Sequence, residues 1–230
     1  RPVQPALLER MAAVTRHRGP DDVGIHADGA CAIGMTRLSI IDLAGGHQPI
    51  ANEDETIWIV CNGEIYNFRE LRHDLEAHGH RFRTNSDSEI LVHAYEQWGE
   101  DFLARLNGMF GFALWDATRR RLVIGRDRLG VKPLYVHEDG KRLAFASEAK
   151  ALLTLPGFRP QVDVVSLQSY LQLGYVAAPR SLFAGVRKLP PATMASVVAG
   201  RVTERTYWSM PSGLDRTANA AEWSERIRDG

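Results

Sequence analysis

The stretch Cys61-Asn62-Gly63-Glu64-Ile65-Tyr66-Asn67 follows the apolar run Ile57-Trp58-Ile59-Val60. The apolar run predicts a short buried strand. Asn62-Gly63 predicts that the strand ends there in a tight turn, because both residues accept backbone angles that other residues resist. Such a turn offers a side-chain amide beside an uncrowded backbone N–H, and these are the two kinds of donor that form an oxyanion hole. On this stretch by itself, an ordinary hairpin turn is the favoured interpretation.

The composition limits the classes of protein to consider. The length of 230 residues fits one domain, or one domain and a piece of another, and the 44% apolar fraction supports a packed core. The 28 basic residues balance the 28 acidic residues, so we expect no nucleic-acid or membrane partner. No apolar run approaches the roughly 18–20 residues of a membrane-spanning helix, and Arg1–Pro5 shows no signal pattern. We therefore expect a cytoplasmic protein.

The two cysteines and the histidines indicate neither a disulfide nor a metal site. Cys31 and Cys61 lie in apolar segments, and in a reducing compartment they are predicted to be free thiols. The eight histidines are scattered, and no Cys/His spacing is typical of zinc. We expect no metal in this chain.

Helical and strand patterns mix along the chain. Ser86 followed by Glu89 predicts a capping box that opens a helix through Trp98. Further helices are predicted over residues 6–17, 68–78, 148–153 and 164–173. Apolar runs and turn residues predict strands over 31–41, 57–60, 110–115, 121–126, 134–137, 142–147, 194–198 and 202–207. Residues 209–220 have the composition of a linker, and a new helix begins at Glu222.

Two charged residues need partners. Arg37 lies in an apolar run, and its planar guanidinium suits a carboxylate of either an internal ion pair or a ligand. Asp87 falls in the first turn of a predicted helix, where it either complements the helix dipole or accepts hydrogen bonds from a ligand ammonium group.

Seven motifs occur in a characteristic order. Together they resemble the N-terminal class II glutamine amidotransferase domain of glutamine-hydrolysing asparagine synthetases, and the resemblance covers about residues 7–209. The motifs are Arg16-His-Arg-Gly-Pro-Asp21, Arg37-Leu-Ser-Ile-Ile-Asp42, Asn62-Gly-Glu-Ile-Tyr-Asn67, Ser86-Asp-Ser-Glu89, Gly108-Met-Phe-Gly-Phe-Ala-Leu-Trp-Asp116, Gly125-Arg-Asp-Arg-Leu-Gly-Val-Lys-Pro-Leu-Tyr135 and Phe145-Ala-Ser-Glu-Ala-Lys-Ala151.

The resemblance implies the N-terminal-nucleophile hydrolase fold. This is an α+β fold, a four-layer αββα sandwich of two antiparallel sheets between helical layers. It also implies a glutamine pocket. Arg37 would hold the substrate α-carboxylate, and Asp87, with Glu64 nearby, would hold the α-ammonium. The side chain of Asn62 and the N–H of Gly63 would hold the oxyanion, while the main chain at Ile40 and Ile41 would line the pocket.

The nucleophile implied by the resemblance is a cysteine at the N-terminus of the first strand. The sequence here begins Arg1-Pro2-Val3-Gln4-Pro5. Neither Cys31 nor Cys61 carries the free α-amine, with a pKa of about 8, that serves as the base. We favour the interpretation that the first strand was left out and the chain is a fragment. The alternative is a variant that has lost its nucleophile, as in the β-lactam synthetase branch. We expect the 230 residues alone to be inactive.

The function implied is hydrolysis of glutamine to glutamate and ammonia, for ATP-dependent amidation of aspartate to asparagine. Residues 1–209 are expected to form the glutaminase domain, and 210–230 a linker and the start of a truncated synthetase domain. No cofactor is expected in this chain; ATP and Mg²⁺ would bind the synthetase domain. The expected partners are glutamine and that C-terminal domain, and a homodimer stays open. The alternatives are an amidotransferase for a sugar or natural-product carboxylate and a non-catalytic interaction domain.

Overall fold

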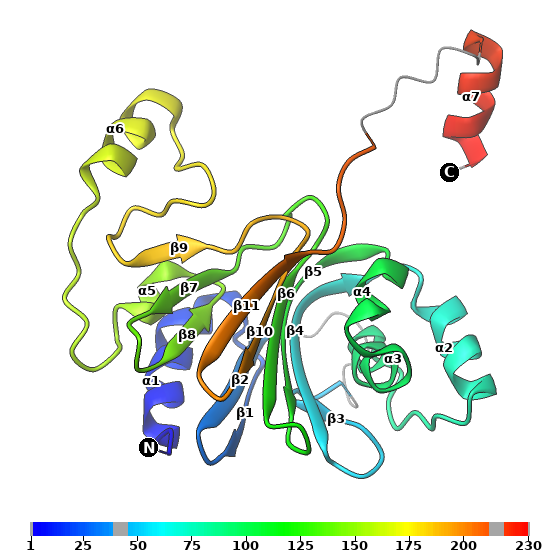
Figure 1. The fold of residues 1–230 in the computed structure, drawn as a ribbon, viewed down its shortest axis with the longest axis horizontal. Coiled ribbons are helices and arrows are strands. Elements are labelled where there is room, and N and C mark those ends of the chain that lie inside the picture. The colour runs from blue at the N-terminus through cyan, green and yellow to red at the C-terminus, as the bar shows by residue number, and fades with distance from the viewer. Residues whose placement is uncertain (1, 39–45, 212–218, 230) are drawn as a thin grey trace.

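A six-stranded antiparallel sheet forms the centre of the molecule (Figure 1). The structure is a computed structural model that describes residues 2–38, 46–211 and 219–229. The strands follow the order β11-β10-β6-β5-β4-β3. Their bounds are β3 Ile50–Ala51, β4 Ile57–Ile65, β5 Gly108–Asp116, β6 Arg121–Arg126, β10 Thr193–Val198 and β11 Arg201–Thr206.

Strand β5 shows why this sheet is buried on both faces. Its side chains alternate between the two sides, as the pleat of a strand requires. Phe112 and Leu114 enter the core on one face, whereas Ala113 and Trp115 enter the core on the other. The almost wholly apolar sequence of this strand is therefore explained by a layer on each side.

One face of the central sheet is covered by helices. These are α2 (Phe68–Ala77), α3 (Ile90–Trp98) and α4 (Phe102–Arg105), as Figure 1 shows. Short 3-10 turns at Asp87–Glu89 and Gly99–Asp101 precede α3 and α4. The side chains in this core are fully buried, and each contributes about 1.5–3 kcal/mol relative to an exposed position. They include Leu75, Leu91 and Phe102.

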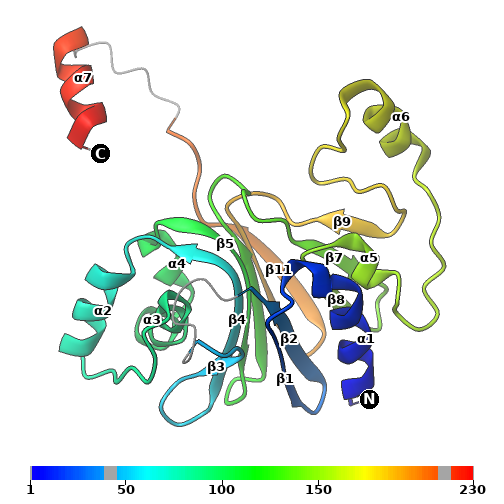
Figure 2. The same cartoon turned by 180° about the vertical axis from the view of Figure 1, so that it is seen from behind.

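The opposite face carries a second layer of strands, which consists of two small sheets in the described part of the chain. The hairpin of β1 (Asp22–Asp28) and β2 (Cys31–Arg37) forms one, and the order β8-β7-β9 forms the other. The bounds are β7 Tyr135–Glu138, β8 Leu143–Ala146 and β9 Val186–Lys188. Helices α1 (Pro5–Thr15) and α5 (Ala149–Leu152) lie outside this layer (Figure 2). The predicted four-layer α+β sandwich is confirmed, with its second sheet layer divided.

Two helices stand away from the layers. Helix α6 (Val164–Leu173) lies on a long excursion between β8 and β9, and α7 (Ala220–Asp229) lies apart from the sheets (Figure 1). Among the residues that the structure describes, every helix is too short or too polar to cross a lipid bilayer.

The predicted turn at Asn62-Gly63 is wrong. Strand β4 continues to Ile65, and Asn62 and Gly63 pair with Gly111 and Phe110 of β5. Glycine is required at position 63 because of a close backbone approach: a Cβ there would lie 2.0 Å from the carbonyl oxygen of Met109. The Asn-Gly pair thus marks tight packing inside a strand rather than its end.

The predicted capping box is only partly correct, because the Glu89 side chain does not make the hydrogen bond that the motif requires. Ser86 Oγ does accept a hydrogen bond from the N–H of Ser88, at 3.3 Å. The Glu89 carboxylate instead accepts hydrogen bonds from the N–H groups of Arg83 and Thr84, both at 2.7 Å. Because Glu89 is fully buried, its charge requires several donors, and the preceding loop supplies them.

Candidate functional site

A cavity of about 840 Å³ lies between the central sheet and the second layer. Strand β4 forms part of its floor, and β2 and β8 form opposite walls. Helix α1 contributes Leu8 and Met11, so the outer part of the cavity is mainly apolar. In the described part of the chain β2 pairs only with β1, and β8 only with β7. The cavity is therefore a slot with a strand edge on each side.

The structure brings five of the seven predicted site residues to this one cavity. Arg37, at the end of β2, and Asp87, at the start of the turn before α3, both line it. The three consecutive residues from Asn62 to Glu64, in β4, complete the set. Ile40 and Ile41 lie outside the described residues, so their predicted role remains a prediction.

The edge of β4 places the N–H of Gly63 toward the site. Among the described residues, β3 pairs only with Trp58 and Ile59, so the following part of β4 has no strand partner on that side. The N–H of Cys61 donates to Gln48 Oε1 at 2.6 Å, and that of Ile65 donates to Asp87 Oδ2 at 2.7 Å. Alternate N–H groups of a strand point to the same side. Gly63, midway between these residues, therefore directs its N–H to this edge.

Asn62 supplies a second donor at the same place. Its side-chain nitrogen Nδ2 is buried and has no hydrogen-bond partner among the described residues. A buried polar atom left unpaired costs about 1–3 kcal/mol. Such a cost is typical of positions where a ligand supplies the missing acceptor. Asn62 Nδ2 and the N–H of Gly63 belong to adjacent residues, and both can donate hydrogen bonds to one developing negative charge.

The charges around the cavity suit a zwitterion. The Arg37 side chain is buried and supplies a cation, while Glu64 and Asp87 supply carboxylates. Burial, and the negative charge of Glu64, raise the pKa of Asp87, although the hydrogen bond from Ile65 opposes this effect. A bound ammonium group would offset the like-charge repulsion between the two carboxylates.

Neither cysteine has the character of a nucleophile. Both are free thiols, as predicted, and Cys61 lines the cavity. Burial is the main cause that raises the pKa of the Cys31 thiol to about 12. Burial also raises the pKa of Cys61, and the charge of Asp87 adds to the shift. Both residues are thus thiols at neutral pH, whereas attack requires a thiolate.

Gln48 is a site residue that sequence reasoning missed. It is buried, and its Nε2 donates to the carbonyl oxygen of Cys61 at 3.2 Å and to Ser88 Oγ at 3.5 Å. Gln48 Oε1 also accepts a hydrogen bond from the N–H of Cys61. The Gln48 amide therefore forms the hydrogen bonds to β4 that a neighbouring strand would otherwise form. Nothing in the loop sequence around Gln48 indicates this contact, because the partners lie 13 and 40 residues away.

Comparison with protein families identifies the family of this chain. A family model described as "Glutamine amidotransferase domain" matches residues 2–208. The chain belongs to the class II glutamine amidotransferase family. The cavity that contains Arg37, Asn62, Gly63, Glu64 and Asp87 therefore lies within the part of the chain that this family model matches.

Relatives of this amidotransferase domain include two asparagine synthetases. The chain is 38% identical over 208 residues to glutamine-hydrolysing asparagine synthetase 3 of Bacillus subtilis, covering 89% of this chain and 34% of that protein. It is 40% identical over 206 residues to asparagine synthetase 1 of the same organism, covering 89% and 32%. The chain thus spans about a third of the length of these relatives.

Solved structures support the fold assignment. Glutamine phosphoribosylpyrophosphate amidotransferase of B. subtilis matches 91% of this chain and 48% of its own, with a TM-score of 0.66 and 19% identity. An allosteric regulatory enzyme of purine biosynthesis matches 80% of this chain and 36% of its own, with a TM-score of 0.57 and 22% identity. These neighbours share the fold of this domain.

Proposed function

We propose that this chain is the glutaminase part of an asparagine synthetase, and that the full-length protein hydrolyses glutamine to glutamate and ammonia. The observation that carries the proposal is the shared cavity, where a buried arginine, two carboxylates and an unpartnered amide donor meet. The identity to synthetases that are named as glutamine-hydrolysing supports the same function.

Glutamine binds by its three polar ends. Arg37 holds the α-carboxylate through its planar guanidinium, and Asp87 with Glu64 holds the α-ammonium. The side-chain amide then lies against Asn62 and Gly63. This arrangement uses Asn62 Nδ2, which has no hydrogen-bond partner among the described residues, and three of the charged groups that line the cavity.

The nucleophilic cysteine belongs to an extended segment that fills the slot between β2 and β8. Both strands line the cavity, and each has one edge without a strand partner in the described part of the chain. Strands in a sheet lie about 4.8 Å apart, so a segment between the two edges completes one continuous sheet layer. The apolar walls, including Met35 and Phe145, suit the inward side chains of such a strand.

The chemistry uses one covalent intermediate. The cysteine thiolate attacks the amide carbon, and the resulting oxyanion accepts hydrogen bonds from Asn62 Nδ2 and the Gly63 N–H. The C–N bond then breaks, and the proton that the α-amine base took from the thiol leaves with ammonia. Water attacks the thioester, and glutamate and the free thiol are released.

The acceptor lies in a second part of the protein. Ammonia passes to a synthetase domain, which binds ATP and Mg²⁺ and amidates aspartate. The names of the relatives, glutamine-hydrolysing asparagine synthetases, support asparagine as the product. We place the boundary at residues 209 and 210, after β11, with the linker and α7 leading to that domain. A cytoplasmic location fits this activity.

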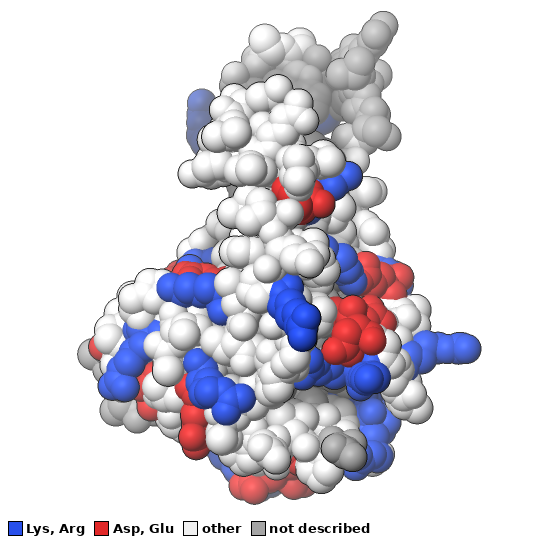
Figure 3. Space-filling model, turned by 90° about the vertical axis from the view of Figure 1, so that its left-hand side faces the viewer, with Lys and Arg blue, Asp and Glu red and all other residues white. Residues whose placement is uncertain are grey.

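Helix α6 supplies a surface for the synthetase domain. Residues 164–179 contain no charged residue. Figure 3 shows that the lobe over α6 is almost free of Lys, Arg, Asp and Glu. Val164 and Leu171 are each 76% exposed, and exposed apolar side chains on one helix are typical of an interface. In the full-length protein, Leu171→Glu should lower the asparagine formed per glutamate released. An unchanged ratio would remove α6 from the interface.

The test uses the full-length protein with glutamine, aspartate and ATP, and measures glutamate and asparagine separately. We expect both products, and we expect Arg37→Ala to raise the KM for glutamine at least tenfold, because the α-carboxylate loses its cation. An unchanged KM would contradict the assignment of Arg37. Glutamate without asparagine would indicate a different carboxylate acceptor, and the absence of glutamate would indicate a non-catalytic domain.

A further inference from the structure

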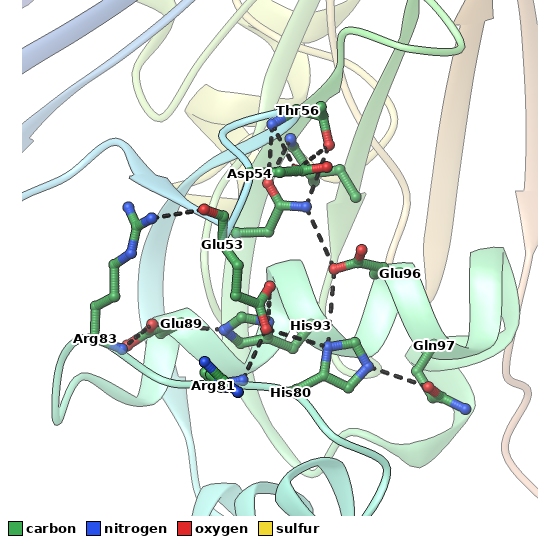
Figure 4. Close-up of polar contacts among 12 residues, drawn as sticks. Glu53, Asp54, Thr56, His80, Arg81, Arg83, Glu89, His93, Glu96 and Gln97 are labelled. Carbon is green, nitrogen blue, oxygen red and sulfur yellow. Dashed lines mark hydrogen bonds and ion pairs between the residues drawn. The ribbon is translucent and has the colours of Figure 1, made fainter.

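Four metal-ligating side chains meet on the helical side of the central sheet, away from the glutamine cavity. They are Glu53 in the loop between β3 and β4, His80 just after α2, and His93 and Glu96 on α3. Their ligand atoms all lie within 4.8 Å of one another. His93 and Glu96 are three residues apart on one helix, so they share a face. Figure 4 shows Glu53 directed toward both histidine rings.

The spacing of these atoms is that of a ligand shell rather than of hydrogen bonds. Glu53 lies 3.4 Å from His93 Nδ1 and 3.8 Å from His80 Nδ1, and Glu96 Oε2 also lies 3.8 Å from His80 Nδ1. Direct N–H···O hydrogen bonds measure about 2.7–3.2 Å. A tetrahedral zinc ion with bonds of about 2.0–2.1 Å separates its ligand atoms by about 3.3 Å. The ligand atoms, which lie up to 4.8 Å apart, would move closer together to reach that geometry.

His93 provides an independent indication that the cluster binds an ion. Its side chain is 0% exposed, and neither ring nitrogen makes a hydrogen bond among the described residues. Nδ1 faces Glu53, and Nε2 lies 3.5 Å from the buried carboxylate of Glu89. A carboxylate behind the distal ring nitrogen is the arrangement that orients metal-binding histidines, because it keeps the proton on that nitrogen.

The other ligands are oriented in the same way. His80 Nε2 lies 3.1 Å from the amide oxygen of Gln97, which can only accept, so the proton is on Nε2 and the Nδ1 lone pair faces the cluster. Glu53 Oε1 accepts a hydrogen bond from the backbone N–H of Arg81 at 2.7 Å. Glu96 Oε2 accepts one from Asn52 Nδ2 at 3.3 Å. Three of the four ligands are thus held by a hydrogen bond with a neighbour that is not itself a ligand, whereas the His93 ring faces Glu89 at 3.5 Å.

We propose that Glu53, His80, His93 and Glu96 form a structural binding site for a divalent first-row transition metal, with Zn²⁺ as the best fit. Two imidazole nitrogens and two carboxylates suit zinc, and two carboxylates balance its charge. Four protein ligands leave no open position, so the role is structural rather than catalytic. The ion would tie the β3–β4 loop to the end of α2 and to α3. This inference is independent of the proposed function.

The site departs from the expectation that the chain binds no metal. Sequence inspection did not reveal it because the ligands come from three segments spread over residues 53–96, and only His93 and Glu96 are close in sequence. The fold brings these four ligands together although the three segments are separated in the sequence.

The test is zinc binding by the full-length protein after chelator treatment and addition of Zn²⁺ alone. The variants His80→Gln and Glu96→Gln change partly exposed residues, so the fold should persist. The matched controls are His73→Gln and Glu70→Gln, exposed residues on α2. Zinc per chain is measured by elemental analysis after dialysis, and the thermal midpoint is measured with and without Zn²⁺.

We expect both site variants to bind one zinc fewer per chain than the wild type and the controls. The zinc-induced rise in thermal midpoint should disappear in the same two variants only. Cobalt substitution of the wild type should give the visible spectrum of a tetrahedral ion, lost in His80→Gln. Equal zinc content in site and control variants would overturn the proposal and leave the cluster as a set of ion pairs.

Discussion

The two faces of the central sheet differ in how completely they are filled. On the face covered by α2, α3 and α4, aromatic and aliphatic side chains interlock, as Phe102 does with Tyr95 and Phe112 at ring separations of 6.0 and 5.8 Å. On the other face, the same strands form the floor of a cavity of about 840 Å³. At that cavity, Asn62 Nδ2 has no hydrogen-bond partner within the described part of the chain. Stability thus resides mainly on the helical face, and the proposed chemistry resides where packing is incomplete.

The largest expected effect on stability comes from the helical face. Phe102→Ala removes a fully buried ring and should lower the free energy of unfolding by about 3–5 kcal/mol. The kcat of the folded full-length protein should change little. Urea unfolding measures the first quantity and glutamate release the second. The control Leu129→Ala, at an exposed position, should stay within about 0.5 kcal/mol. Equal losses in both variants would contradict the assignment of this core.

Gln48→Ala tests the junction between the two faces. The change leaves the buried N–H of Cys61 without its partner, which costs about 1–3 kcal/mol of unfolding free energy. Because the edge of β4 also carries the oxyanion donors, kcat for glutamine hydrolysis should fall as well. The exposed Gln168→Ala serves as the control. A loss of stability with full activity would show that Gln48 supports the fold but not the site.

Tyr95→Phe removes a single polar contact from the helical face. The Tyr95 hydroxyl donates to the buried carboxylate of Asp116 at 3.1 Å, and its loss should cost about 1–2 kcal/mol. The pKa of Tyr95 is raised to about 12, mainly by burial, so the hydroxyl stays protonated near neutral pH. The cost should therefore be constant across the neutral range in unfolding experiments. A cost that vanished at mildly alkaline pH would contradict this account.

Asp87→Asn should change the free energy of unfolding least. Near neutral pH it should raise this free energy, whereas Phe102→Ala, Gln48→Ala and Tyr95→Phe should lower it. Burial, followed by the charge of Glu64, raises the pKa of Asp87 in the folded state above its unfolded value of about 3.9. The stabilising contribution of the protonated form is present below the unfolded pKa and is lost as pH rises through the folded pKa. Asparagine does not titrate, so the variant should not lose this stability as the pH rises. Its affinity for glutamine should fall. Parallel stability profiles of variant and wild type from acid to neutral pH would refute the shift.

Regular elements were predictable where the residue pattern has a clear period. Helix α6 and strand β6 have the bounds that their sequences predict, because apolar residues and flanking turn residues mark both ends. Strands β1, β3 and β9 were not predicted. Strand β1, Asp-Val-Gly-Ile-His-Ala-Asp, has too few apolar side chains, and β3 and β9 have two and three residues.

The candidate site was predictable in its residues but not in its geometry. Arg37 and Asp87 were recognisable as charges in apolar surroundings, and the family resemblance supplied the pocket. The extension of β4 through Gly63 depends on contact with Met109, which lies far along the chain. The contacts of Gln48 and the cluster around His93 likewise depend on tertiary packing that no local pattern encodes.

The central claim is that the incompletely packed face contains the glutaminase site. The most direct test is the kcat for glutamate release by the full-length Asn62→Ala variant, measured together with its free energy of unfolding. Loss of one oxyanion donor should lower kcat by about 100- to 1000-fold. Stability should not fall, because Asn62 Nδ2 makes no hydrogen bond among the described residues. A variant with wild-type kcat, or one whose lost activity is explained by unfolding, would contradict the account.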